Sequence, residues 1–519
     1  MLCTVQIYRF DADFLWLYPT FPASVLFFCL VKVIVCGAGV SGLAVSIRLA
    51  AAGHSVQLLE AASYPGGKLT SFTEKGYRFD AGPSLFTLPQ LVYDLLKMGT
   101  DDLSSGFHVL ALDPVCHYFY PDGTQLQTPA SRDALALLIS SKLGEDRHRV
   151  KAYLNKSALV YGITSPVFLE NSLHKLRTYF SKNGFRGILN LWRIDMLRSM
   201  DKANRTWFKN PKTVQLFNRY ATYNGSNPYK APATLNVISH LEYSLGAWLP
   251  AKGMQDITDV LVKKAESLGV EIRLNCAVAE IITRNKRIQS VRTHSGQELE
   301  ADVVVSGIDA KLTYTRLLNL PVPGRIQKAE NSSSALIFYW GVRRDFPELD
   351  VHNIFFSADY EKEFDLLFNE GNITDDPTVY INITSKKIPV DAPRGCENWF
   401  VMVNAPANTG QDWEELRKRT RSSVLKKLSA QLGCDIEPLI DYEDYLDPVR
   451  IESRTGSNKG SLYGTSSNSR MAAFFRQANF SSAVKGLYFC GGSVHPGGGI
   501  PLCLLGARIV ANLIPENKT

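Results

Sequence analysis

The chain has 519 residues, of which 45% are hydrophobic and 21% are charged, and its formal net charge is +7 at pH 7. These proportions are typical of a globular protein, and they exclude a disordered chain, a collagen and a polytopic membrane protein. The small positive charge permits an anionic partner without requiring one.

Residues 1–30 precede the first recognisable motif. They include most of an apolar run at 21–31, which is too short to span a bilayer and is interrupted by Lys32. Residues 1–20 contain a single basic residue, Arg9, whereas a signal peptide begins with a basic region. We therefore expect residues 1–30 to form an extension outside the functional fold, with a membrane-touching anchor as the alternative.

Residues 32–60 predict a compact βαβ unit. The β-branched run at 33–37 is typical of a strand, residues 40–53 have helical periodicity and end in a glycine, and residues 55–60 form a second short strand that ends in an acid. A strand, a tight turn, a helix and a second strand in this order make up the βαβ motif.

The turn of this unit carries the sequence Gly37-Ala38-Gly39-Val40-Ser41-Gly42. Gly37 permits the tight turn, Gly39 lets the backbone approach a pyrophosphate, and Gly42 lets the helix pack close to the strand. The phosphates then meet free N–H groups at the positive end of the helix dipole. Glu60 falls 18 residues after Gly42, where a carboxylate accepts hydrogen bonds from ribose hydroxyls. The pattern predicts dinucleotide binding, and a glycine-rich turn in a purely structural βαβ unit is the alternative.

A second glycine pair follows closely, at Gly66 and Gly67, and Lys68 comes directly after it. Two glycines followed by a cation suit a loop that folds back over a diphosphate and the edge of a flavin, which a plain NAD-binding unit does not need. Lysine can supply the positive charge, although only arginine forms a bidentate fork. A surface turn is the alternative.

The middle of the chain is less distinctive. Residues 90–240 are predicted to be mostly helical, residues 256–269 to form a helix, residues 270–281 to form one alternating strand, and residues 301–310 to form a buried strand that runs into a loop. Residues 335–450 mix strands and helices.

Residues 174–209 hold nine Lys and Arg residues and two Asp residues, interleaved with aliphatic and aromatic side chains. Part of this stretch is predicted to be a basic amphipathic helix. Cations beside Trp and Phe suit an anionic membrane surface, and a solvated helix over the core is the alternative. No nucleic-acid recognition motif accompanies the charge, so we expect no nucleic-acid partner.

Residues 486–514 form the last motif region. A strand ends in Gly491-Gly492, and a glycine-rich loop through Gly499 and Ile500 leads into a helix at about 502–514. The N-terminus of that helix points positive charge at a nearby electron-rich group, and a reduced flavin is such a group.

A few side chains are candidates for the substrate site or for proton transfer. Glu242 and Asp80 are candidate buried acids. His495, beside the C-terminal loop, is a candidate for proton transfer, although a loop-stabilising hydrogen bond is the favoured interpretation. We expect a polar and aromatic cluster to line a substrate cavity, with an ordinary domain interface as the alternative: Tyr220, Tyr223, Asn224, Tyr229 and Lys230.

The nine cysteines are scattered, with no CxxC pair and no Cys/His spacing typical of a metal site. We therefore expect a reducing compartment and no bound metal. Cys490 and Cys503 suggest covalent flavin attachment as one interpretation, and two small buried residues as the favoured one.

The three glycine-rich patterns together resemble the FAD-dependent amine-oxidase-like superfamily and, more narrowly, the bacterial carotenoid desaturases of the phytoene-desaturase type. The resemblance covers about 31–514 and is carried by GAGVSGLAVSIRLAAAGHSVQLLE, YPGGKLTSF, YRFDAGPSLFTLP and GLYFCGGSVHPGGGIPLCLLGARIVANL. FNRYATYNGSNPYKAPAT, HNIFFSADY and YGTSSNSRMAAFFRQAN are most similar to the 1-hydroxycarotenoid 3,4-desaturase branch.

The resemblance implies a mixed α/β fold, in which a Rossmann-like FAD-binding domain of the amine-oxidase type is interleaved with a substrate-binding and membrane-facing domain. It implies an FAD-binding domain made of 31–100, 241–315 and 450–519, and a second domain made of 101–240 and 316–449. The FAD contacts that it implies come from all three glycine-rich motifs and two strands: Gly37, Gly39, Gly42, Glu60, Gly66, Gly67, Lys68, Val278, Gly491, Gly492, Gly499 and Ile500.

The sequence departs from the family pattern in two places. Lys68 stands where many relatives have Arg, and Gly307-Ile308-Asp309 stands where many have Asn-Ala-Asp. Both departures leave the local geometry open.

The resemblance also implies a function. It implies an FAD-dependent oxidoreductase that introduces a C=C bond into an acyclic, 1-hydroxylated carotenoid, with the flavin as the reactive group. A phytoene desaturase, a carotene cis–trans isomerase and a non-catalytic prenyl-lipid escort protein are alternatives. It further implies a substrate drawn from a bilayer, oxygen or a quinone as electron acceptor, and a cytoplasmic protein peripherally associated with the inner membrane. An amine oxidase is disfavoured because no matching aromatic cage is recognisable.

Overall fold

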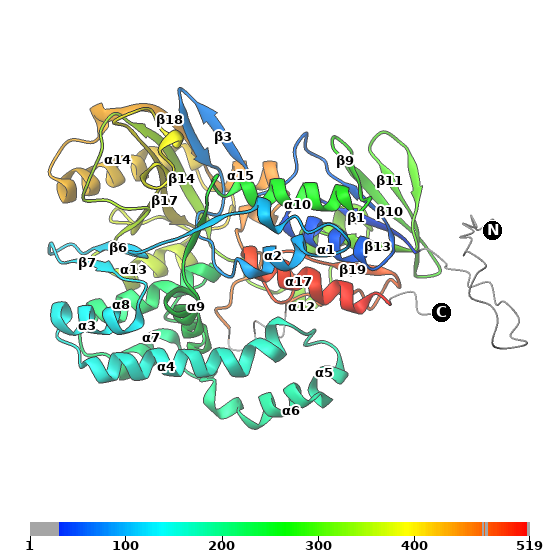
Figure 1. Cartoon of the computed structure of the whole chain (residues 1–519), viewed down its shortest axis with the longest axis horizontal. Helices are drawn as coiled ribbons and strands as arrows, with labels where there is room; N and C mark the ends of the chain where they lie inside the picture. The colour runs from blue at the N-terminus through cyan, green and yellow to red at the C-terminus, as the bar shows by residue number, and fades with distance from the viewer. Residues whose placement is uncertain (1–30, 470–471, 473–475, 516–519) are drawn as a thin grey trace, which may run out of the picture.

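The computed structural model of the chain describes residues 31–469, 472 and 476–515. The extension expected at 1–30 lies outside the described residues. Figure 1 shows the strands of a parallel sheet at the right, those of a larger sheet at the upper left, and a group of helices below.

Five parallel strands form the sheet that carries the first and last motifs. In its central strand, Val33 and Val35 pack against helices, whereas Ile34 and Cys36 pack toward a three-stranded sheet on the other face. Burial on both faces accounts for the unbroken apolar run in the sequence. In spatial order the strands are β19 (Leu487–Phe489), β13 (Val303–Ser306), β1 (Lys32–Cys36), β2 (Ser55–Leu59) and β9 (Glu271–Arg273).

Helices cover one face of this sheet and a small antiparallel sheet covers the other. The helices are α1 (Val40–Ala51), α2 (Gln90–Leu96), α10 (Gln255–Ser267) and α17 (Ile500–Leu513). The three-stranded sheet consists of β10 (Val278–Arg284), β11 (Arg287–Thr293) and β12 (Glu298–Glu300).

The single strand expected at 270–281 is wrong. The chain leaves the parallel sheet after Arg273, turns at Asn275 with a φ of 52°, and enters the three-stranded sheet at Val278. Because asparagine tolerates the left-handed region better than most residues, it suits this turn between two sheets.

A mixed seven-stranded sheet forms the second half of the molecule. In β14, Phe338 and Trp340 belong to the core beneath helix α14 (Trp413–Leu432), whereas Ile337 and Tyr339 pack on the opposite face with the hairpin of β3 (Ser71–Glu74) and β4 (Tyr77–Asp80). In spatial order the strands are β18 (Ile440–Leu446), β14 (Ser334–Val342), β17 (Glu397–Ala405), β16 (Val379–Ile383), β15 (His352–Phe355), β6 (Cys116–Phe119) and β7 (Gln125–Thr128).

The region expected to be mostly helical, 90–240, is interrupted by strands β5 (Val109–Ala111), β6 and β7, and β5 pairs with β8 (Trp248–Pro250). All four residues of β6 are buried, so its sequence shows no alternation that would reveal a strand. The helices of this layer are α3 (Arg132–Leu143), α4 (Arg147–Thr164), α7 (Met200–Trp207), α8 (Pro211–Asn218) and α9 (Ile238–Leu245). Shorter helices elsewhere are α11 (Ala310–Leu312), α12 (Gly324–Gln327), α13 (Tyr360–Asp365) and α15 (Pro448–Thr455).

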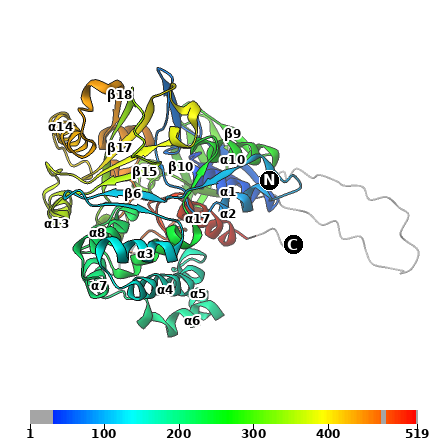
Figure 2. The same cartoon turned by 60° about the vertical axis from the view of Figure 1, so that its left-hand side comes forward.

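The basic stretch at 174–209 folds into short pieces rather than one long helix. They are α5 (Leu176–Phe180), α6 (Lys182–Leu189), the single turn η3 (Leu191–Arg193) and α7. Ser181 separates α5 from α6, because its backbone is extended and its hydroxyl accepts a hydrogen bond from Gly184 N at 3.0 Å. Figures 1 and 2 both show α5 and α6 at the lower edge of the molecule, below α4.

Among the helices of the described residues, none is both long enough and apolar enough to cross a bilayer.

Candidate flavin site and substrate cavity

A cavity of about 1130 Å³ is lined by residues of both large sheets and of the helical layer. Pockets for a single small molecule commonly enclose roughly 300–1000 Å³. The cavity therefore has room for a cofactor and a second ligand together.

The first glycine loop lies at one end of this cavity. Gly37 has a φ of 101° and donates its N–H to Leu59 O at 2.7 Å, which sets the turn between β1 and α1. A Cβ atom on Gly42 would lie 1.9 Å from Gly37 O, so only glycine lets α1 approach the strand this closely. No side chain caps α1 and no acid lies in its first turn. Its free N–H groups thus suit a diphosphate.

The Glu60 carboxylate lies beside this loop and lines the cavity. Its two oxygens accept hydrogen bonds from Ala38 N at 2.7 Å and Ala62 N at 2.9 Å. An ionised carboxylate has about four acceptor sites, so acceptor capacity remains for ribose hydroxyls. Val278, at the start of β10, lines the same part of the cavity as its neighbour Ala277.

The second glycine loop packs directly on the first. Gly66 donates its N–H to Ala38 O at 2.8 Å, and a Cβ atom on Gly67 would lie 3.4 Å from Gly39 Cα. Gly66 and Gly67 both have positive φ, at 109° and 60°. The two glycine motifs, which are separate in the sequence, therefore form one glycine-lined wall.

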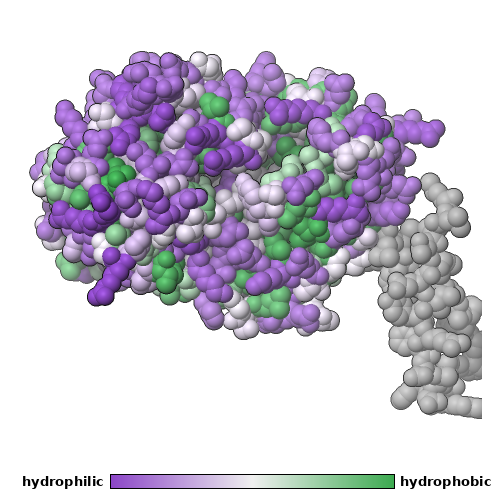
Figure 3. All heavy atoms as spheres, turned by 90° about the horizontal axis from the view of Figure 1, so that it is seen from above, coloured by the Kyte–Doolittle hydropathy of each residue, from purple (hydrophilic) through white to green (hydrophobic). Residues whose placement is uncertain are grey.

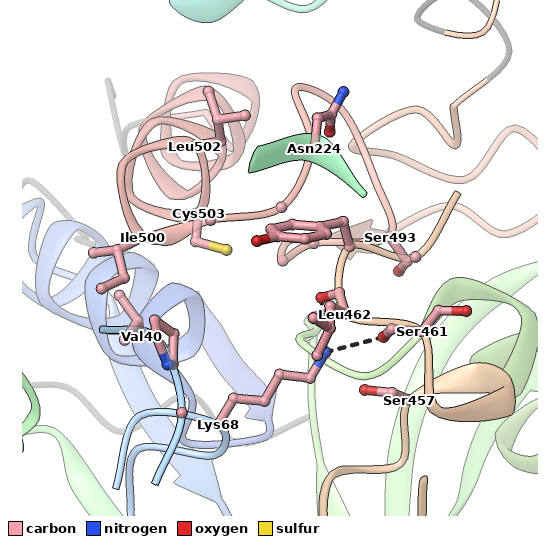
Figure 4. Close-up of a pocket in the computed structure, with 18 of the residues that line it drawn as sticks. Val40, Lys68, Asn224, Ser457, Ser461, Leu462, Ser493, Ile500, Leu502 and Cys503 are labelled. Atoms are coloured by element: carbon pink, nitrogen blue, oxygen red, sulfur yellow. Dashed lines mark hydrogen bonds between the residues drawn. The ribbon is translucent and has the colours of Figure 1, made fainter. Parts of the chain in front are cut away.

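Lys68 extends across the cavity in Figure 4 toward the backbone of Ser461 and Leu462. Its ammonium donates to Leu462 O at 2.9 Å and to Ser461 O at 3.3 Å. Burial lowers the pKa of Lys68 to about 8. Two carbonyl dipoles hold this cation without neutralising it, so it can also stabilise an anionic group in the cavity.

The lowered pKa of Lys68 predicts a pH dependence of the protein without FAD. Because an unfolded lysine binds its proton up to about pH 10.4, the unfolded chain binds more protons than the folded chain between that value and about pH 8. The contribution of Lys68 to stability is therefore expected to rise with pH across this window. The slope of stability against pH should therefore be more positive in the wild type than in Lys68→Met, and this difference should be smaller with FAD bound. Melting temperature against pH measures it, and identical slopes for the wild type and Lys68→Met would contradict it.

The C-terminal motif completes the wall. Gly491 and Gly499 have φ values of 106° and 101°, and α17 begins directly after Gly499 with no side-chain cap. Figure 4 shows Ile500 and Cys503 of α17 beside Val40 of α1, so the N-termini of the two helices meet at the cavity. Both helix dipoles thus present positive charge there.

Cys490 is a small buried residue, whereas Cys503 is half-buried and lines the cavity. Cys490 is fully buried in the core that α1 and α17 share. Burial raises the pKa of Cys503 to about 11 and that of Cys490 to about 12, so both are thiols at neutral pH.

Gly307-Ile308-Asp309, one of the two departures from the family pattern, also fits this wall. A Cβ atom on Gly307 would lie 3.0 Å from Cys36 O, so the glycine allows a close backbone approach. Asp309 accepts a hydrogen bond from Lys311 N at 2.9 Å and caps α11. Ile308 and Asp309 both line the cavity.

Of the twelve residues predicted to contact FAD, all except Gly42 line this one cavity. Gly42 instead packs against Gly37 O behind the loop. The glycine cradle, the free helix N-termini, the Glu60 carboxylate and the buried cation all suit FAD.

The five residues expected to line a substrate cavity are divided. Tyr223 and Asn224 line the cavity, whereas Tyr220, Tyr229 and Lys230 do not. Tyr220 is buried in the core, the ring of Tyr229 packs edge-on against Phe364, and Lys230 donates to Asn369 Oδ1 at 2.8 Å.

A buried ion pair that the sequence does not reveal lies beside Tyr220 and Tyr223. Arg219 Nη2 donates to Glu242 Oε1 at 2.7 Å, and both residues line the cavity although Arg219 is 4% exposed and Glu242 1%. Tyr220 and Tyr223 donate their hydroxyls to the two oxygens of Glu242 at 2.9 and 2.5 Å. Glu242 was expected to be a buried acid. Its partner Arg219 lies 23 residues away on another element. No local sequence signal reveals that pairing.

The other candidate acid, Asp80, is also buried and has a structural environment. It accepts from Arg78 Nη2 at 2.8 Å and from Met254 N at 3.0 Å. The bond from Met254 N joins the β3–β4 hairpin to the start of α10.

His495 is fully buried but is not among the residues that line the cavity. Its Nε2 lies 3.0 Å from Asn171 O, and its ring lies against Phe168 and His174. Burial lowers its pKa to about 4, so the ring is neutral at pH 7. This placement joins the C-terminal loop to the segment before α5.

Comparisons with known proteins agree with this geometry. The model of the family "Flavin containing amine oxidoreductase" matches residues 40–515. The chain is 46% identical to the 1-hydroxycarotenoid 3,4-desaturase of a Flavobacterium species, over 94% of this chain and 99% of that protein. It is 33% identical to the 4,4'-diapolycopene oxygenase of a Methylomonas species, over 93% and 98% of the two chains.

Among solved structures, putrescine oxidase bound to putrescine superposes with a TM-score of 0.62 at 17% identity, covering 93% of this chain and 99% of that one. At this identity the likeness concerns the fold alone. The matched length and the glycine-lined wall lead to one conclusion: the chain belongs to the flavin-containing amine oxidoreductase family, and its cofactor is FAD.

Proposed function

We propose that this chain is an FAD-dependent desaturase that introduces the 3,4 double bond into an acyclic 1-hydroxylated carotenoid. The observation that carries the proposal is the 46% identity, over nearly the whole of both chains, to a relative named for that reaction. Relatives named as phytoene desaturase and 4,4'-diapolycopene oxygenase also match over most of the chain, which supports a carotenoid as the class of substrate.

Bound FAD would supply the oxidising chemistry, accepting a hydride from one carbon while the neighbouring carbon loses a proton. The chain would supply position and a dry environment. Beyond the flavin wall, the cavity is lined largely by apolar side chains, which suit a polyene and exclude water: Leu85, Leu235, Ile238, Ile354, Phe400 and Met402. No cavity-lining histidine or acid needs to act as nucleophile in this reaction.

The residues of the glycine-lined wall take their roles from this proposal. In this proposal the loop of Gly37, Gly39 and Gly42 binds the diphosphate. Glu60 binds the ribose, and Val278 contacts the adenine. The flavin end lies against the two remaining motifs, which contribute Gly66, Gly67, Lys68, Gly491, Gly492, Gly499 and Ile500. Tyr223 and Asn224 belong to the substrate end, and His495 stabilises the C-terminal loop rather than transferring protons.

We also propose the division into an FAD-binding domain of 31–100, 241–315 and 450–519 and a second domain of 101–240 and 316–449. The strands support it, since the parallel sheet draws its strands from the first set of segments and the seven-stranded sheet from the second.

Product analysis tests the proposed reaction. The chain is expressed in a host that accumulates 1-hydroxylated acyclic carotenoids. The pigments are separated by chromatography, and their masses are measured by mass spectrometry. Desaturation predicts loss of two hydrogens and a longer conjugated chromophore. An unchanged mass would indicate an isomerase, an added oxygen an oxygenase, and unchanged pigment beside a colourless purified protein an escort protein. Each of these results overturns the proposal.

We propose that α5, α6 and η3 rest on a membrane surface. Phe180 is 86% exposed and Trp192 76%, and Leu176, Phe185 and Leu189 are exposed beside them. The same segments carry Arg177, Lys182, Arg186 and Arg193, which suit anionic headgroups. Figure 3 shows the upper face, turned away from α5 and α6 in Figure 1, as mostly hydrophilic with hydrophobic side chains gathered right of centre.

Residues on either side of these segments line the cavity. Phe168 and Leu169 precede α5, Ile194 and Met196 follow η3, and all four line the cavity. We therefore propose that a polyene leaving a bilayer at this surface enters the cavity beside these four residues. Cytoplasmic location at the inner membrane, and oxygen or a quinone as final electron acceptor, complete the proposal.

Removing the two most exposed aromatic anchors should weaken membrane binding. Burying one large apolar side chain contributes about 1.5–3 kcal/mol, so Phe180→Ala/Trp192→Ala is expected to reduce partition into anionic vesicles by at least about 10-fold. Vesicle flotation measures it. Val390→Ala is the matched control, because Val390 is 85% exposed and lies outside this surface. Equal losses in both variants, or no loss in the first, would contradict membrane docking here.

A further inference from the structure

His352 has an unused hydrogen-bonding atom inside the cavity. It is 3% exposed and lines the cavity on β15, together with Ile354 two residues later on the same face of the strand. Its Nε2 has no hydrogen-bond partner among the described residues. A buried polar atom without a partner costs about 1–3 kcal/mol, so a ligand that supplies the partner is stabilised there.

The neighbours of the ring determine what Nε2 can do. Nδ1 lies 2.8 Å from the Tyr380 hydroxyl and 3.3 Å from Asn382 Nδ2. Asn382 Nδ2 also donates to Val351 O at 3.0 Å, so the amide is oriented with its donor end toward the ring. Because an amide nitrogen only donates, Nδ1 is the acceptor and the proton of the neutral ring resides on Nε2. Nε2–H is therefore a donor that requires an oxygen acceptor.

In the part of the chain that the structure describes, no acid contributes to the protonation of this ring. Burial, with a smaller contribution from the Arg219 charge, lowers the pKa of His352 to about 3, so the ring stays neutral. Both oxygens of Glu242 are occupied by Arg219, Tyr220 and Tyr223. The neutral ring therefore presents its Nε2–H to the cavity as an uncharged donor, which suits an uncharged acceptor.

A short polar chain connects His352 to the flavin side of the cavity. Tyr380 also hydrogen-bonds Ser84 Oγ at 2.9 Å, and Ser84 and Tyr380 both line the cavity. Ser84 lies two residues after Gly82, whose hypothetical Cβ would lie 1.7 Å from Lys68 O. The segment of Gly82 and Ser84, which hydrogen-bonds Tyr380 beside His352, thus packs on the loop that carries Lys68.

We propose that His352 Nε2–H donates a hydrogen bond to the 1-hydroxyl oxygen of the carotenoid and so selects hydroxylated over unhydroxylated substrate. The inference rests on the proposed function. In such a substrate only three bonds separate the oxygen from C3 of the reacting C3–C4 bond, so a donor near the flavin side would also place that bond. Tyr380 acts as a positioning residue, because its hydroxyl holds Nδ1 as the acceptor. Arg219 lines the cavity as well, and its Nε also has no hydrogen-bond partner within the described ranges.

Paired substrates test this selection. The FAD-loaded protein is incubated with liposomes holding either a 1-hydroxylated acyclic carotenoid or the same polyene without the hydroxyl, and kcat/KM is measured for each. A site built around a substrate hydroxyl strongly disfavours the analogue that lacks it, so the wild type is expected to prefer the hydroxylated substrate by at least about 100-fold. His352→Phe should reduce this ratio roughly 10- to 100-fold. His352→Gln, which keeps a donor, should recover part of it, and Tyr380→Phe should give an intermediate ratio.

His117→Phe is the matched control. His117 lies on the adjacent strand β6 opposite Asn353, is buried, has Nδ1 within 3.0 Å of Glu348 O, and does not line the cavity. Its ratio should equal that of the wild type. Binding of each carotenoid is followed by the quenching of tryptophan fluorescence by the polyene. In His352→Phe the preference in binding for the hydroxylated carotenoid should fall as the preference in kcat/KM does. This measurement separates a recognition defect from misfolding.

The outcomes separate the two proposals. If the wild type desaturates neither carotenoid, the proposed function fails. If it desaturates both equally, or if His352→Phe and His352→Gln keep the wild-type ratio, the desaturase stands and hydroxyl recognition by His352 is overturned.

Discussion

Gly42→Ala is expected to be recovered without FAD and with a lower melting temperature. Alanine in a helix is favoured over glycine by up to about 1 kcal/mol, but its Cβ would lie 1.9 Å from Gly37 O. Relieving that overlap moves either α1 or the diphosphate loop, and overpacking of this kind commonly costs about 1–3 kcal/mol or more. The clash therefore outweighs the helix propensity. Flavin absorbance per protein and the FAD dissociation constant measure the effect, and we expect affinity to fall at least 100-fold, about 2.7 kcal/mol.

Gly162→Ala is the matched control for this variant. Gly162 lies in α4, and no atom outside its own helix lies within 4 Å of a Cβ built there. The same substitution should keep full FAD content and leave stability equal or higher. Wild-type FAD affinity in Gly42→Ala would show that the loop does not need this close approach.

Arg219→Met is expected to lower the free energy of unfolding by about 3–5 kcal/mol, because it leaves the buried Glu242 carboxylate without its cation. The side chains are 5% and 1% exposed, so water cannot replace the lost partner. Chemical denaturation of the FAD-loaded protein measures the change. A loss below about 1 kcal/mol would contradict a stabilising role of this ion pair.

Two further variants distinguish the ion pair from lost packing. Arg219→Met/Glu242→Gln removes both charges and should be more stable than Arg219→Met alone, since no buried charge is left unpaired. Lys418→Met breaks an exposed pair with Glu414, whose side chains are 61% and 69% exposed, and should leave stability unchanged. Equal stability of the single and double Arg219 variants would contradict the electrostatic explanation.

The local parts of the fold could be predicted from the sequence because each of their signals spans a few residues. The expected strand at 33–37 and helix at 40–53 correspond to β1 and α1 with ends that differ by one or two residues. The helix expected at 256–269 is α10, and the C-terminal strand and helix are β19 and α17. In each case a glycine at the end of the element and the apolar periodicity indicate the same boundary.

The errors arise where tertiary contacts override such patterns. The alternation at 270–281 is continuous, yet the chain changes sheets at Asn275, and only the pairing of β9 with β2 and of β10 with β11 separates the two strands. Part of the basic stretch at 174–209 was expected to be a basic amphipathic helix, and helices α6 and α7 lie within it, but the sequence alone does not show where the stretch is interrupted. Ser181 interrupts it by capping α6 with its own hydroxyl.

The cavity shows the same contrast between local and long-range information. The glycine motifs indicate a flavin wall because spacing and residue type alone specify it. The hydrogen bonds of Arg219 with Glu242, and of His352 with Tyr380 and Ser84, join residues on different elements, and Ser84 lies 296 residues from Tyr380. Pairings of this kind depend on the packed fold, so the polar groups of the substrate end could not be assigned from the sequence.

The most direct test of the central claim is a single anaerobic turnover. FAD-loaded protein is mixed with liposomes that hold a 1-hydroxylated acyclic carotenoid, and flavin absorbance and carotenoid mass are followed together. The account predicts that the yellow flavin bleaches while the carotenoid loses two hydrogens, in equal amounts. A flavin that stays oxidised, or a carotenoid that keeps its mass or gains oxygen, would contradict it.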